Sequence, residues 1–167
     1  RRSGSRSGTC PPSAASGPLY RKVLYVTMLD TLAGVRFNKK LYPENRARFS
    51  RFVLEHCSWP EAELTSLPFL FEKLKELKME TGPLGRFVSE KLSHFSTNDG
   101  GSVEAAKMDE PSATLMQHAA SEKEEAAISK YEHIALLYRY RNWLVHESRE
   151  PGYAMEAFAD QPAPYYH

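Results

Sequence analysis

Apolar residues recur every three or four positions along most of the chain, which is the spacing of helices with one buried face. No segment shows sustained period-two alternation, so strands are not predicted. The pattern therefore predicts an all-α fold, an up-and-down bundle of four to five helices. The helices are expected over about 19–34, from after Pro43 to Cys57, over 67–78, over 84–95, and from a Ser121-x-x-Glu124 capping box to about Glu147.

One domain with a tail on either side is expected from the change in composition along the chain. Residues 1–18 are rich in Arg, Ser, Gly and Pro, and predict a flexible N-terminal tail. The helical bundle domain is expected over 19–150, with a mobile insertion at about 96–120 where an Asn-Asp-Gly-Gly turn is followed by small and polar residues. Residues 151–167 form a C-terminal extension that stops without a terminating pattern, which leaves open whether the natural chain continues.

Composition narrows the classes of partner. The 167 residues carry 22 Lys and Arg against 21 Asp and Glu, a net charge of +1, so no large basic field is available for long nucleic acid. An RNA or nucleotide partner would have to be engaged locally. No apolar run is long enough to span a membrane, and no membrane partner is expected. Two cysteines, Cys10 and Cys57, are too few for a disulfide framework, and Cys57 is expected on an apolar helical face, which favours a reducing, cytoplasmic location.

Polar chemistry is concentrated near the end of the longest predicted helix, in Arg141-Asn142-x-x-x-His146. On an α-helical wheel Asn142 and His146 are about 40° apart, whereas Arg141 is about 140° from His146. The long arginine stem allows its guanidinium to swing toward the imidazole. A fixed cation, an orienting amide and a group that titrates near neutral pH together suit phosphate chemistry.

A loose version of this pattern is expected by chance. With 12 Arg and 6 His, an Arg followed five residues later by His should occur about 0.4 times in a random order, and it occurs twice, since Arg51 and His56 also fit. Requiring Asn, Asp or His directly after the Arg lowers the expectation to about 0.04, and Arg141 alone satisfies it. We interpret His56 as a histidine at a helix boundary without a chemical role.

With Asn142 included, the motif resembles the signature of the HEPN superfamily (higher eukaryotes and prokaryotes nucleotide-binding domains), and the likeness in shape extends from about Leu19 to His146. The resemblance implies a metal-independent endoribonuclease without cofactors, whose active site forms where two motif helices meet in a homodimer. It assigns catalysis to Arg141 and His146, with Asn142 supporting them. It also suggests a toxin or defence component with an antitoxin-type protein partner. Some HEPN toxins that are paired with a nucleotidyltransferase are modified on a tyrosine two residues after the motif histidine. This chain has Ser148 at that position, which puts regulation by such a modification in doubt.

Two further residues are candidate supports of the site. Glu147 adjoins His146 and either assists it or is simply solvated, and Tyr138 belongs to an aromatic series that either stacks bases or packs in the core or dimer interface. The apolar residues of the motif helix, expected to form the dimer interface, are Tyr138, Trp143, Leu144 and Val145. No metal site is expected, because His118 and His133 lack partners at metal-ligand spacing. The alternatives are a catalytically silent HEPN-like bundle that binds nucleotide, RNA or a protein, and a plain helical interaction protein whose motif is incidental.

Overall fold

The computed structural model describes residues 16–95, 103–147 and 165–166, of which 72% are helical. The α-helices are, in chain order, α1 (Ser16–Arg36), α2 (Asn45–His56), α3 (Leu67–Glu76), α4 (Pro83–Ser93), α5 (Ala105–Met108), α6 (Ser112–Met116), α7 (Glu122–Lys130) and α8 (His133–Asn142). A 3₁₀ turn η1 (Pro60–Glu63) precedes α3, and a π-helical turn η3 (Trp143–Glu147) continues α8. The prediction of a mostly helical protein is confirmed, and α1 to α4 lie where helices were expected.

Four two-residue strands, which were not predicted, form two small antiparallel ladders. Strand β1 (Leu64–Thr65) pairs with β3 (Glu110–Pro111), and β2 (Val103–Glu104) pairs with β4 (Tyr165–Tyr166). Strands this short carry no readable alternation of apolar and polar residues, so the sequence contains no signal for them.

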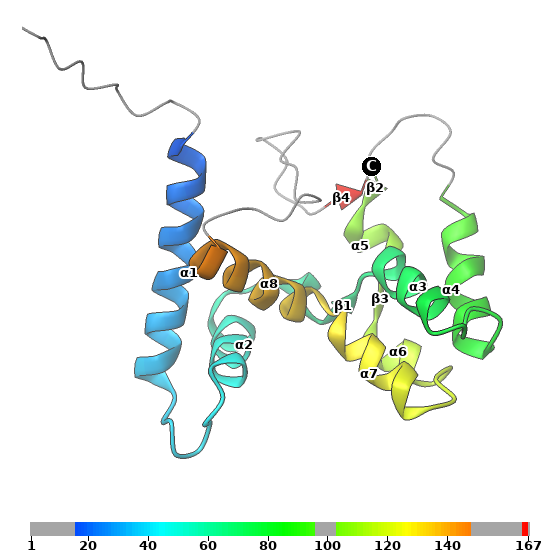
Figure 1. The fold of residues 1–167 in the computed structure, drawn as a ribbon, viewed down its shortest axis with the longest axis horizontal. Helices are drawn as coiled ribbons and strands as arrows, with labels where there is room; N and C mark the ends of the chain where they lie inside the picture. Colours follow the sequence, from blue (N-terminus) through cyan, green and yellow to red (C-terminus); the bar gives the residue numbers. More distant parts are fainter. Residues whose placement is uncertain (1–15, 96–102, 148–164, 167) are drawn as a thin grey trace, which may run out of the picture.

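The helices pack around two separate cores rather than one. At one end of the molecule α1 and α2 lie side by side, and α8 crosses from them toward a second group made of α3, α4, α6 and α7 (Figure 1). The larger core belongs to that second group and contains Leu67, Leu70, Leu74, Leu84, Val88, Leu115, Ala127 and Ile128. The smaller core lies between α2, η1 and α8 and contains Phe49, Val53, Ala62 and Ile134.

The single long helix expected from Ser121 to Glu147 is wrong, because the chain breaks between α7 and α8. Its start is confirmed: the Ser121 side chain accepts a hydrogen bond from the backbone N–H of Glu124, as in a capping box. At the break, Glu132 is extended (ψ 143°), the carbonyl of Tyr131 accepts a hydrogen bond from Ser66 N at 3.0 Å, and Glu132 pairs with Thr65. These contacts with a distant segment replace intrahelical hydrogen bonds, so tertiary structure overrides the helical pattern.

A buried aspartate lies beside the break. The Asp109 carboxylate accepts a hydrogen bond from Leu67 N at 3.0 Å, at the start of α3, and its other oxygen lies 2.7 Å from His133 Nε2, at the start of α8. The Asp109 side chain is fully buried. The carboxylate therefore joins the starts of two helices that are 66 residues apart by number.

The described part of the segment expected to be a mobile insertion contains short helices and strands. Residues 103–120 form β2, α5, β3 and α6, and Leu115 of α6 is fully buried in the larger core. Short helices with one or two buried residues give too few repeats for a periodic pattern to be recognised. Residues 96–102, like the two expected tails 1–15 and 148–164, lie outside the described residues.

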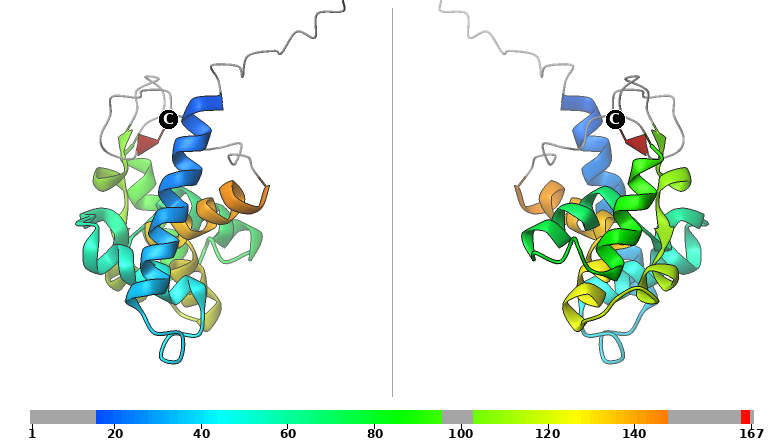
Figure 2. Two further views of the ribbon diagram at one scale, coloured as in Figure 1. Left: turned by 90° about the vertical axis from the view of Figure 1, so that its left-hand side faces the viewer. Right: turned by 90° about the vertical axis from the view of Figure 1, so that its right-hand side faces the viewer.

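Helix α1 is apolar on its exposed side as well as on its packed side. Val26 and Ala33 of α1 are buried, and so is Phe37, which lies just past the end of the helix. The exposed apolar face of α1, defined here by its large side chains, comprises Tyr20, Leu24, Tyr25, Met28, Leu32 and Val35, with Tyr20 70% and Val35 83% exposed. These positions lie within about 140° of one another on a helical wheel, away from the buried ones. Figure 2 shows α1 standing at one side of the molecule.

No helix among the described residues combines the length and the hydropathy that a membrane crossing requires.

Candidate functional site

The motif lies where α8 passes into the π-helical turn η3. A π-helix hydrogen bonds from residue i to i+5, so residues five apart become neighbours on successive turns. Arg141 and His146 are five apart, and Arg141 Nη1 lies 3.5 Å from His146 Nε2. In a regular α-helix the two side chains would leave the axis about 140° apart. Here the winding changes between the two residues, because Arg141 belongs to α8 and His146 to η3, and their side chains lie together.

Arg141 is held on several sides by residues of the same chain. It is only 8% exposed, and its Nη2 donates to Asp30 Oδ2 on α1 at 2.5 Å. Its Nη1 donates to Asn142 Oδ1 at 2.8 Å, and its guanidinium carbon lies 5.8 Å from the centre of the Tyr138 ring. The buried Nε has no hydrogen-bond partner among the described residues. The guanidinium is thus positioned firmly, by an ion pair between two helices.

His146 differs from Arg141 in being exposed. An arginine N–H can only donate, so a hydrogen bond from Arg141 requires His146 Nε2 to be unprotonated. The unprotonated nitrogen is also the form that a general base needs. Glu147 is exposed at the end of η3. The site therefore offers an accessible imidazole beside a fixed guanidinium, a pair that could accept a proton and stabilise negative charge.

Asp30 is the site residue that sequence reasoning missed. It is the single acidic residue before Glu44, among eight Lys and Arg in the first 43 positions. A lone acid on a mostly apolar helix was a usable signal, because such a charge tends to be paired. Its partner could not be read from the sequence, since 111 positions separate Asp30 from Arg141.

The expectation that the apolar residues of the motif helix remain free for a dimer interface is wrong for Leu144, whereas Tyr138 is half-buried. Leu144 is 1% exposed within the single chain. The Tyr138 ring packs against Phe49 of the smaller core, with ring centres 5.5 Å apart. Trp143 and Val145 are half-buried. Most of this surface is therefore used inside the chain, and the large exposed apolar side chains lie mainly on α1.

The chance match at Arg51 and His56 does not form a comparable pair. Arg51 donates to Glu55 at 2.5 Å, and this hydrogen bond is the main cause of a raised pKa for Arg51. His56 is the last residue of α2 and packs its ring on Phe52. Because α2 is a regular α-helix, residues five apart stay on different sides. The interpretation of His56 as a residue of a helix boundary is confirmed.

Cys57 does not lie on the apolar helical face where it was expected. It follows the end of α2 as the C-cap residue and is exposed. Partial desolvation nevertheless raises the pKa of its thiol, so a smaller fraction is the reactive thiolate at neutral pH. The described residues contain no group of three or more His, Cys, Asp and Glu side chains placed to hold a metal ion.

No family model, no curated protein and no solved structure matches this chain.

Proposed function

We propose that this protein is a metal-independent endoribonuclease of the HEPN type, with Arg141 and His146 as its catalytic residues. The observation that carries the proposal is the 3.5 Å approach of Arg141 Nη1 to His146 Nε2 at a π-helical turn. Turns of this kind are rare and occur frequently at functional sites. The match of a rare backbone feature to a sequence motif supports a role for the pair beyond packing.

In the proposed reaction, the ribose 2′-hydroxyl displaces the Arg141 N–H from His146 Nε2, and Nε2 then takes the proton of that hydroxyl. The 2′-oxygen then attacks the adjacent phosphorus, the bond to the 5′-oxygen breaks, and that oxygen gains a proton from water or from a protonated His146 of a second subunit. Arg141 stabilises the charge on the phosphoryl oxygens, and Asn142 orients the guanidinium through the bond to its Oδ1. The products are a 2′,3′-cyclic phosphate and a 5′-hydroxyl. No metal-bound water is needed, because the substrate supplies the nucleophile.

A second candidate is a catalytically silent HEPN-like bundle that binds nucleotide, RNA or a protein partner. The observation in its favour is the burial of Arg141 and its ion pair with Asp30. A substrate phosphate would have to compete with that carboxylate for the guanidinium. In this case the Asp30–Arg141 pair is a structural link between α1 and α8, and His146 has no proton to transfer.

The proposed active form is a homodimer, as the resemblance implies. The exposed apolar face of α1 supports this, because contiguous exposed apolar surface of this kind marks interaction sites. The same helix also contributes to the site, because Asp30 on its packed side, opposite this face, binds Arg141. A toxin or defence role with an antitoxin-type protein partner belongs to the same proposal.

Incubation of the purified protein with mixed RNA in EDTA tests the proposal. The ribonuclease is expected to cleave RNA in EDTA, and a His146→Ala variant is expected to lose that activity. Equal inactivity of folded wild-type protein and His146→Ala on every RNA would favour the silent bundle. Loss of a genuine wild-type activity in EDTA would exclude the proposed mechanism.

A further inference from the structure

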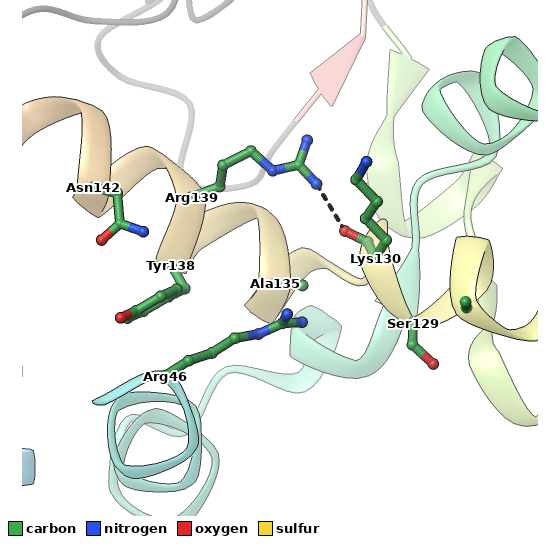
Figure 3. Close-up of a pocket in the computed structure, with 8 residues that line it drawn as sticks. Arg46, Ser129, Lys130, Ala135, Tyr138, Arg139 and Asn142 are labelled. Atoms are coloured by element: carbon green, nitrogen blue, oxygen red, sulfur yellow. Dashed lines mark hydrogen bonds between the residues drawn. The ribbon is translucent and has the colours of Figure 1, made fainter. Parts of the chain in front are cut away.

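A pocket of about 570 Å³ lies between the start of α2, the end of α7 and one side of α8 (Figure 3). Its volume is within the range of about 300–1,000 Å³ that small-molecule sites occupy. Ala126 and Ala135 contribute apolar surface, and Ser129 and Asn142 contribute polar groups. The catalytic proposal does not use this pocket, but Asn142 belongs to both the pocket lining and the motif.

The charge of the pocket has one sign. Arg46 from α2, Lys130 from the end of α7 and Arg139 from α8 line it, and none of the described lining residues is acidic. Figure 3 shows that these three side chains come from three different elements. In a chain with a net charge of only +1, three cations around one hollow are a local concentration of positive charge.

Two of these cations are held in place. Arg139 Nη2 donates to the carbonyl of Lys130 at 3.0 Å, and its guanidinium carbon lies 5.2 Å from the centre of the Tyr131 ring. Lys130 Nζ lies 5.7 Å from the same ring. Tyr131 is the residue at which α7 ends, so the break before α8 also positions the cations. A cation that is already ordered loses less side-chain entropy when it binds an anion.

Nearby acidic groups have partners of their own. Glu76 lines a neighbouring hollow together with Arg139, but it accepts a hydrogen bond from Lys73 at 2.6 Å. That hydrogen bond is the main cause of the lowered pKa of Glu76, and Lys130 contributes least. The charge of the pocket is therefore not cancelled by a carboxylate within its lining.

We propose that this pocket binds phosphate groups, carried either by a free nucleotide or by an RNA strand. Guanidinium groups donate paired hydrogen bonds to phosphate oxygens, Lys130 adds a point charge, and the Ser129 hydroxyl adds a donor. The volume of the pocket and its apolar surface leave room for a nucleoside beside the phosphates. The proposal does not require catalysis at His146.

Calorimetry with four probes tests the proposal on the full chain: adenosine, inorganic triphosphate, ATP, and a 2′-O-methyl RNA octamer that the proposed ribonuclease could not cleave. Triphosphate, ATP or octamer should bind more tightly than adenosine, and affinity should fall with salt. Tighter binding of ATP than of the octamer indicates a free nucleotide, and the reverse indicates a strand. Equal binding of adenosine and ATP would overturn the proposal, and so would no binding of any phosphate ligand.

Charge-reversal variants locate the site. Arg46→Glu and Lys130→Glu should each weaken binding about tenfold or more, and both positions are exposed, so the fold should persist. Lys75→Glu is the matched control, because Lys75 is an exposed cation on α3 that pairs with Glu72 outside the pocket. Binding that survives both pocket variants, or that Lys75→Glu lowers equally, would contradict the assignment. Because no cleavage is measured, failure here is distinct from failure of the ribonuclease proposal.

Discussion

At the scale of single residues, the ion pair between Asp30 and Arg141 decides how the motif is presented. The Arg141 side chain is 10% exposed and that of Asp30 is 28% exposed, and the carboxylate neutralises the guanidinium. An arginine left buried without its carboxylate loses a charged hydrogen bond and keeps the cost of desolvation. The pair should therefore stabilise the fold more than the surface pairs do.

Asp30→Asn, which keeps the shape of the side chain, should lower the free energy of unfolding by about 1.5–3 kcal/mol in urea denaturation. Glu55→Gln is the matched control: it removes the carboxylate of the exposed Arg51 pair and should change the free energy by about 0.5 kcal/mol or less. In an Arg141→Ala background, Asp30→Asn should have little effect, which a double-mutant cycle measures. Equal losses for the two single variants would show that the Asp30–Arg141 pair has no special role.

The sequence predicts which residue types form the site, but only part of how they are placed relative to one another. The approach of Arg141 to His146 was anticipated from the length of the arginine stem, but the apolar pattern contains no signal for the π-helical turn in which His146 lies. Asp30 was missed because pairing across 111 positions depends on tertiary structure. Residue types are local information, whereas the distances between them are not.

At the scale of elements, two helical glycines provide opposite tests of the packing. A Cβ on Gly34, in the last turns of α1, would meet no atom within 4 Å, whereas a Cβ on Gly85 in α4 would lie 2.2 Å from the carbonyl oxygen of Glu80. Gly34→Ala should raise the free energy of unfolding by about 0.5–1 kcal/mol through helix propensity. Gly85→Ala should lower it by about 2 kcal/mol or more, because backbone must shift. Thermal denaturation of both variants checks the prediction, and a stabilising Gly85→Ala would refute the packing of α4.

The junction of α3, α7 and α8 depends on Asp109. Asp109→Ala removes the acceptor of Leu67 N and the partner of His133 Nε2 together, and should lower the free energy of unfolding by about 2–4 kcal/mol. Glu104→Ala, which removes an exposed carboxylate paired with Lys107 in the same segment, should cost about 0.5 kcal/mol or less. Chemical denaturation compares the two, and similar values would mean that Asp109 does not hold this junction.

The elements show where apolar periodicity is sufficient and where it fails. Helices α1 to α4 have apolar residues at helical spacing and were predicted close to their bounds. The break at Tyr131 and Glu132 was missed because both residues fit a helical pattern, and hydrogen bonding to Thr65 and Ser66 is what interrupts it. The elements within residues 103–120 have no signal in the sequence, because elements of two to five residues are too short to show a period.

At the scale of the whole molecule, the exposed apolar face of α1 is the surface that a second copy is expected to cover. Wild-type protein at about tens of micromolar should show a dimer mass in light scattering, since a stable interface needs about 800 Å² from each partner and this face supplies six large side chains. Leu24→Glu with Met28→Glu should give monomer, because burial of two carboxylates is costly.

Leu54→Glu serves as the control, since Leu54 is an exposed leucine on α2, outside this face. It should leave the dimer intact. A monomeric wild type would contradict the homodimer, and a dimer that survives the α1 double variant would place the interface on another surface.

The architecture of the whole molecule was predicted only in its class. The helical content was predicted from the spacing of apolar residues. The predicted single bundle is not observed, because the chain breaks between α7 and α8 and the helices are divided between two cores. Which faces meet across a chain of this length depends on contacts that no local pattern records.

The central claim, that Arg141 and His146 cleave RNA through the ribose hydroxyl, is tested most directly by the rates and end groups of cleavage in EDTA. His146→Ala and Arg141→Ala should each lower the rate by about 10² or more, while His56→Ala should leave it nearly unchanged. The fragments should carry 2′,3′-cyclic phosphate, and DNA of the same sequence should survive. Cleavage that His146→Ala leaves intact, or fragments with a 5′-phosphate, would contradict the account.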